Sequence, residues 1–165
     1  MRALALVFSA LSLLQACSDE CRAPDDLASG VLEGTLDGEV WKASDAAWAE
    51  AGASLQLGHS MVDGVMMSIV INSASDTQPV QDLLDRQELP FEVLLGEGDD
   101  GGWVTVYREG STASYHTQNA AGGSMTFAAR EGDDLLGCMQ FDAATNDGES
   151  ISFVDGYFRF GLRED

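Results

Sequence analysis

From Val31 onward the chain is a succession of short runs, apolar or alternating between apolar and polar residues, separated by glycine, aspartate and asparagine. Such runs between turn residues are typical of β-strands, whose successive side chains point to opposite faces. We expect strands at residues 31–36, 39–43, 53–57, 65–71, 91–95, 103–107, 111–116, 124–129, 135–143 and 150–160. The sequence therefore predicts an all-β fold, an antiparallel sandwich or barrel of about ten short strands.

Two local signals refine this expectation. Asp37-Gly38 joins the first two runs and is a strong signal for a two-residue hairpin. Asp155-Gly156 interrupts the alternation of the last run, which has apolar side chains on both faces. A bulge or kink there would switch the inward face from Ile151 and Phe153 to Phe158 and Phe160.

At most one short helix is expected. Residues 79–85 begin with a proline, follow the possible caps Asp76 and Thr77, and place apolar residues at helical spacing. Residues 46–51 allow a turn of helix, a strand or a loop equally.

The N-terminus has the character of a secretory signal. Arg2 is followed by a nearly unbroken apolar run to Leu14, too short to span a bilayer. The segment Leu14-Gln15-Ala16-Cys17 resembles a bacterial lipobox, in which the chain is cut before a cysteine that becomes lipid-modified. This divides the chain into a signal peptide (1–16), an anchor cysteine with an acidic tether (17–30) and a single β-domain (31–165). A plain signal peptide cut near Ala16, or a buried N-terminal helix, are the alternatives.

The lipobox resemblance also implies a location. Ser18, rather than aspartate, directly after the cysteine implies sorting to the outer membrane, with the domain facing the periplasm or the cell surface. The lipid on Cys17 would then be the contact with the membrane.

The other two cysteines become an even pair if Cys17 carries lipid. In an oxidising compartment we expect a disulfide between Cys21 and Cys138, the alternative being two unpaired thiols.

The charge balance excludes one class of partner. The formal net charge is −20, and Lys42 is the only lysine in the chain. Nucleic-acid binding requires clustered lysine and arginine, so no nucleic-acid partner is expected. Docking of the folded surface on anionic lipid is excluded for the same reason.

No motif in the sequence indicates a catalytic site, a metal site or a cofactor site. His59 and His116, the only histidines, are expected at the surface, and no Gly-x-Ser-x-Gly motif is present. The acidic, glycine-rich segments 97–102 and 142–149 suit calcium in composition but lack EF-hand spacing, so solvated turns are expected. We therefore predict no catalytic residue, no metal ligand and no cofactor.

The aromatic residues suggest a possible ligand surface. Trp41 and Trp103 lie within strands among apolar neighbours and are expected in the core. Trp48, and after it Tyr115, are the best candidates for an exposed platform that binds a sugar or another ligand.

A family resemblance rests on three segments. Residues 34–43, with Gly34, Gly38 and Trp41, resemble the opening of a group of small bacterial lipoproteins of unknown function, and residues 137–143 and 154–158 resemble later strands of that group. The resemblance implies a compact all-β domain and brings no catalytic residues. We expect an outer-membrane-anchored lipoprotein that is not an enzyme and serves envelope structure or interaction with an unknown envelope protein or glycan. The alternative is a module that binds carbohydrate or calcium.

Overall fold

The computed structural model describes residue 21 and residues 23–51, 54–72, 89–96 and 101–163. Within them the chain is β-structure with one short 3-10 helix, η2 (Thr117–Asn119). The strands are β1 (Val31–Leu36), β2 (Glu39–Ala43), β3 (Ala47–Ala51), β4 (Ser54–Gly58), β5 (Val65–Asn72), β6 (Phe91–Leu95), β7 (Gly102–Arg108), β8 (Ser114–His116), β9 (Gly122–Glu131), β10 (Asp134–Ala144) and β11 (Ser150–Leu162).

The predicted all-β class is confirmed, and each of the ten expected runs overlaps an observed strand. The expectation of a purely antiparallel sheet is wrong, because β11 pairs with β3 and β6 with β7 in parallel. The segment at residues 46–51, left open by the sequence, forms the additional strand β3. The helix expected at residues 79–85 lies outside the described residues. No helix within the described ranges has the length and apolar character needed to cross a membrane.

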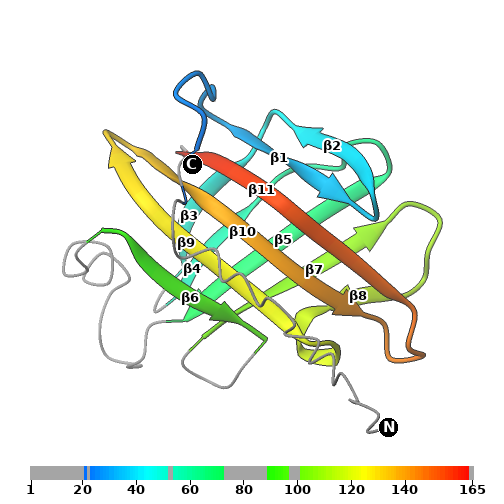
Figure 1. Cartoon of the computed structure of the whole chain (residues 1–165). Helices are drawn as coiled ribbons and strands as arrows, with labels where there is room; N and C mark the ends of the chain where they lie inside the picture. The colour runs from blue at the N-terminus through cyan, green and yellow to red at the C-terminus, as the bar shows by residue number, and fades with distance from the viewer. Residues whose placement is uncertain (1–20, 22, 52–53, 73–88, 97–100, 164–165) are drawn as a thin grey trace, which may run out of the picture.

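Eight of the strands close into a barrel. The pairing order is β2-β1-β11-β3-β4-β5-β7-β6-β9-β10-β8, and β10 also pairs with β11. This last pairing closes the ring β11-β3-β4-β5-β7-β6-β9-β10, to which β1, β2 and β8 are added. Figure 1 shows β9, β10 and β11 on one side of the barrel, with β3, β4, β5 and β7 behind them.

The barrel interior is filled by side chains. Phe127, Phe153, Phe158 and Phe160 are at most 1% exposed. The ring centroids of Phe127 and Phe158 are 5.6 Å apart, and those of Phe158 and Phe160 are 5.0 Å apart. Burial of these rings and of the aliphatic residues around them is the main stabilising contribution to the fold.

The hairpin predicted at Asp37-Gly38 is confirmed. Asp37 has φ of 50° and Gly38 has φ of 83°, as the two-residue turn between β1 and β2 requires. The Asp37 carboxylate accepts a hydrogen bond of 2.9 Å from the Ser152 N–H and forms an ion pair with Arg108. These contacts connect the hairpin with β11 and β7.

The predicted kink in the last strand is also confirmed. Asp155 has φ of 51°, and the register of β11 against both β1 and β10 shifts at this point. Ile151 and Phe153 are buried before the bulge, and Phe158 and Phe160 after it. The bulge therefore lets one long strand turn apolar side chains of different parity into the same core.

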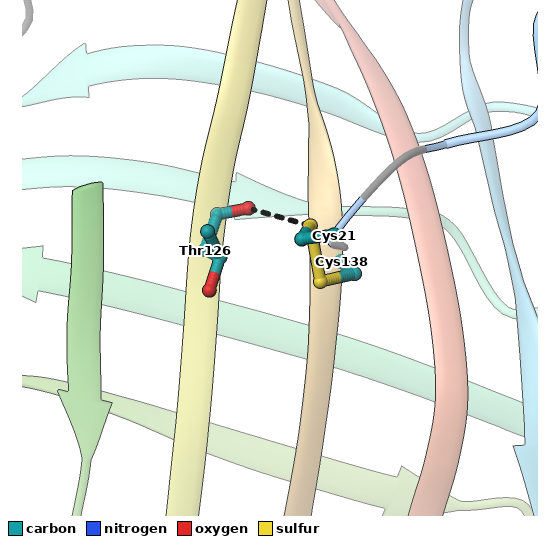
Figure 2. The surroundings of a disulfide bond; sticks show 3 residues. All are labelled: Cys21, Thr126 and Cys138. Atoms are coloured by element: carbon teal, nitrogen blue, oxygen red, sulfur yellow. Dashed lines mark hydrogen bonds between the residues drawn. A yellow bond between two sulfur atoms is a disulfide. The ribbon is translucent and has the colours of Figure 1, made fainter. Parts of the chain in front are cut away.

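The segment before β1 lies on the outer side of β10 and β11. Cys21 and Cys138 are at disulfide-bonding distance with Cα atoms 5.7 Å apart, in agreement with the predicted pair. Figure 2 shows Cys21 against the outer side of β10, with its sulfur 3.7 Å from the Thr126 carbonyl oxygen of β9. Leu27 is buried, and the Gly30 N–H donates a 2.8 Å hydrogen bond to the Arg159 carbonyl. The second half of the expected tether therefore packs against the barrel.

Candidate functional site

One outer face of the barrel has, among the residues that the structure describes, no outward-pointing aspartate, glutamate, lysine or arginine. It is formed by β3, β4, β5, β7 and β8, which pair in succession. The inward residues of these strands include Trp48, Leu57, Ile69 and Val104, all at most 3% exposed, so the alternate residues point outward. We call this surface the neutral face; its residues are Ala47, Ala49, Ala51, Ser54, Gln56, Gly58, Met66, Ser68, Val70, Asn72, Trp103, Thr105, Tyr107, Ser114 and His116.

Charged side chains occur at outer positions of β6, β10 and β11. Glu92 projects from β6 and Asp142 from β10, and both are exposed. Arg159 of β11 pairs with Asp134 of β10 at 2.6 Å, and this hydrogen bond raises the pKa of Arg159. In a chain with a formal charge of −20, five adjacent strands without a charged outer side chain form a distinct surface.

A row of small side chains crosses the neutral face. Ala47 pairs with Gly58, Gly58 with Ser68, and Ser68 with Thr105. A Cβ atom at Gly58 would lie 2.7 Å from the Met67 carbonyl oxygen, so the close approach of β4 and β5 requires glycine there.

Larger side chains flank this row on both sides. Gln56, Val70 and Trp103 are paired along one side. Met66 and Tyr107 are paired along the other. The result is a shallow pocket of about 650 Å³ whose lining includes Gly58, Ser68, Gln56, Met66 and Tyr107, with Asp45 and Arg163 also contributing.

The prediction that Trp48 and Tyr115 are exposed is wrong. Trp48 borders the pocket but is only 3% exposed, and its indole N–H donates to the Asp133 carbonyl at 2.8 Å. Tyr115 is 6% exposed, and its hydroxyl donates to Glu149 Oε2 at 3.3 Å. Both point inward because Trp48 lies opposite buried Leu57, and Tyr115 opposite buried Val106.

The aromatic residues of the neutral face are Trp103 and Tyr107. Trp103, expected in the core, is half-buried on the outside, whereas Trp41 is buried as predicted. Tyr107 is 40% exposed. A sequence signal for this arrangement exists: Thr105 lies between them and shares their parity, while Val104 and Val106 have the opposite parity. A polar residue in the middle of one set favours that set as the outward one.

His59 is buried, so the prediction of a surface position is wrong. Its Nε2 accepts a 3.0 Å hydrogen bond from the Met67 N–H, which leaves Nδ1–H to donate to the Ser60 carbonyl. The ring lies 4.9 Å from that of Trp41, and burial lowers the pKa of His59. Both ring nitrogens are bonded to backbone groups, so the arrangement is structural.

His116 lies between two hydroxyl groups. Its Nε2 is 2.8 Å from Ser114 Oγ, and its Nδ1 is 3.2 Å from Thr105 Oγ1. A serine–histidine pair activated for nucleophilic attack needs a carboxylate to stabilise the imidazolium, and a threonine hydroxyl carries no charge. The three side chains therefore form a polar cluster at one end of the neutral face.

The acidic segment at residues 142–149 forms a closed turn. The Thr145 N–H donates to the Glu149 carbonyl at 2.8 Å, and the Asn119 side-chain amide donates to Asn146 Oδ1 at 3.1 Å. In the described part of the chain, no group of three or more histidine, cysteine, aspartate or glutamate side chains is placed to hold a metal ion. Residues 97–100 of the other acidic segment lie outside the described residues.

The anchor cysteine, Cys17, also lies outside the described residues. In comparisons with known proteins, no family model, no curated protein and no solved structure matches this chain.

Proposed function

We propose that this chain is a lipid-anchored protein of the bacterial outer membrane, not an enzyme, that presents its neutral face to an envelope partner. The observation that carries this proposal is the position of the tether relative to that face. In the ring of eight strands, β10 lies four strands from β5 in either direction, so the two are on opposite sides of the barrel. Cys138 is on β10, and the centre of the neutral face is on β5.

The tether is short enough to orient the domain. Cys21 follows Cys17 by four residues, which span at most about 14 Å when fully extended. A lipid on Cys17 would therefore hold the outer side of β10 near the membrane surface. The neutral face would then point away from the bilayer, toward the periplasm or the exterior.

The histidine geometry supports a role without catalysis. His59 is held by two backbone groups, and His116 has no carboxylate partner among its hydrogen bonds. The pocket on the neutral face has one carboxylate, Asp45, whose pKa is lowered chiefly by its hydrogen bond with Ser60. A carboxylate that remains ionised is poorly suited to act as a general acid.

The anchor is tested by Cys17→Ser. The variant should be recovered in the soluble fraction after cell disruption, whereas the wild-type chain should stay with the outer membrane. If the variant remains in the membrane fraction, the anchor is not at Cys17 and this part of the proposal fails.

The orientation is tested with single amine labels, because Lys42 is the only lysine. In a Lys42→Arg background, Asp142→Lys places an amine on β10 and Gln56→Lys places one on β4; both positions are exposed. Each variant is labelled with a fluorophore and anchored in phosphatidylcholine vesicles that contain a quencher lipid. Quenching should be strong at residue 142 and weak at residue 56, and equal quenching would contradict the proposed orientation.

A further inference from the structure

We propose that the neutral face binds an extended, uncharged oligosaccharide that lies along the row of small residues, with sugar rings against Tyr107 and Trp103. This inference rests on the neutral face being the docking surface proposed above, and names the chemical class of its ligand. It does not depend on the lipid anchor.

The two aromatic rings are placed to contact a chain of sugars. Trp103 and Tyr107 point outward from the same strand, four residues apart, which corresponds to about 13–14 Å along β7. Thr105, between them, lies at the level of the small-residue row. Sugar rings have apolar C–H faces that pack on aromatic rings, and a chain of several linked rings is long enough to reach both.

The polar groups of the face match sugar hydroxyls. Gln56 and Ser68 both line the pocket, and Gln56 is exposed. At one edge of the neutral face, Ser54 Oγ lies 2.9 Å from Asn72 Oδ1. At the opposite edge, Ser114 Oγ lies 2.8 Å from His116 Nε2. Hydroxyl and amide groups both donate and accept hydrogen bonds, as sugar hydroxyls do.

The charge distribution selects a neutral ligand. The formal charge of −20 repels anionic glycans, and Arg163 is the single cationic residue among those that line the pocket. Asp45 is the single carboxylate among the same lining residues, so one acidic and one basic side chain leave the pocket without the net charge that a cationic ligand requires. An uncharged ligand forms no ion pair with the protein, so its affinity should be nearly independent of salt.

The test is isothermal titration calorimetry on the full chain with four neutral hexasaccharides: cellohexaose, maltohexaose, chitohexaose and mannohexaose. At least one should bind, with an affinity that is the same at low and high salt. Tyr107→Ala and Trp103→Ala should each weaken binding about tenfold, the loss expected for one aromatic contact. Ser68→Glu, which places a carboxylate in the pocket lining, should abolish it.

The matched control is Tyr157→Ala. Tyr157 is also half-buried on an outer strand face, but it pairs with Cys138 on the tether side. Its replacement should leave binding unchanged, and circular dichroism should show that all variants remain folded.

Three results would overturn the inference: no heat with any of the sugars at about 1 mM, equal weakening by Tyr157→Ala, or a strong salt dependence. A concentration-dependent dimer in sedimentation that Ser68→Glu dissociates would instead assign the face to a second copy of the chain. A failure of sugar binding leaves the fractionation result for Cys17→Ser unaffected, so the two proposals fail separately.

Discussion

The indole N–H of Trp48 donates a 2.8 Å hydrogen bond to the Asp133 carbonyl, which connects β3 with the turn between β9 and β10. Trp41, equally buried, differs: its Nε1 has no hydrogen-bond partner among the described residues. A buried donor without a partner carries a desolvation cost of about 1–3 kcal/mol. The two tryptophans therefore contribute differently to stability although both lie in the core.

This difference predicts losses of stability of different size for the same substitution at the two positions. Trp48→Phe loses a hydrogen bond and apolar contact, whereas Trp41→Phe removes an unpaired donor, which offsets part of its packing loss. Trp41→Phe should be milder than Trp48→Phe by about 1–2 kcal/mol of unfolding free energy in urea denaturation. Equal losses would contradict the assignment of Nε1 as unpaired.

The link between Cys21 and Cys138 predicts a large stability effect, because the two residues are 117 positions apart. The double variant Cys21→Ser/Cys138→Ser should lose about 2–5 kcal/mol, since the unfolded chain regains the freedom of a long loop. Urea denaturation gives the loss, and intact mass before and after reduction should show the gain of two hydrogens. Cys17→Ser is the control and should unfold like the wild-type chain. An unchanged mass on reduction would show that no bridge exists.

Local signals in the sequence predicted the strands well. Asp37-Gly38 and Asp155-Gly156 contain residues with positive φ, and both the hairpin and the bulge follow from the few residues around them. The closure of the barrel had no such signal. It depends on β11 pairing with β10 on one side and with β3 on the other, and β3 lies more than 100 residues earlier in the chain.

The face that an aromatic residue occupies was harder to predict. Trp48 is flanked by alanines, so its strand shows no alternation that would mark an inward side. Strand β7 has apolar residues at both parities, and Thr105 is the one polar residue that marks the side of Trp103 as the outward one. Its outward position is set by pairing with β5, where Ile69 and Met67 already face the core. The outward residues of the candidate site were therefore identified from the pairing of the strands in the structure.

Gly137 lies where β10 passes closest to β9 and β11. A Cβ atom there would be 1.9 Å from the Thr126 carbonyl oxygen and 2.5 Å from the Phe158 ring. Gly137→Ala should therefore separate the strands and reduce stability by about 3 kcal/mol.

Gly132→Ala is the control for this prediction. Its Cβ atom meets no other atom within 4 Å, so only its positive φ of 62° opposes alanine. It should lose about 1 kcal/mol in thermal unfolding. A smaller effect at Gly137 than at Gly132 would contradict this packing.

The buried His59 predicts a pH-dependent stability. Burial lowers its pKa below the value of about 6.5 for an exposed histidine, so the unfolded chain takes up the proton first as the pH falls. The contribution of neutral His59 is fully present above about pH 6.5 and is lost as the pH falls through the folded-state pKa. Each unit of pKa difference corresponds to about 1.4 kcal/mol.

His59→Gln keeps an acceptor for the Met67 N–H and removes the titration. Urea denaturation at a series of pH values should show a decline below about pH 6.5 in the wild-type chain and a flatter profile in the variant. Parallel profiles would show that His59 is not the group responsible, because the remaining acidic side chains are the same in both proteins.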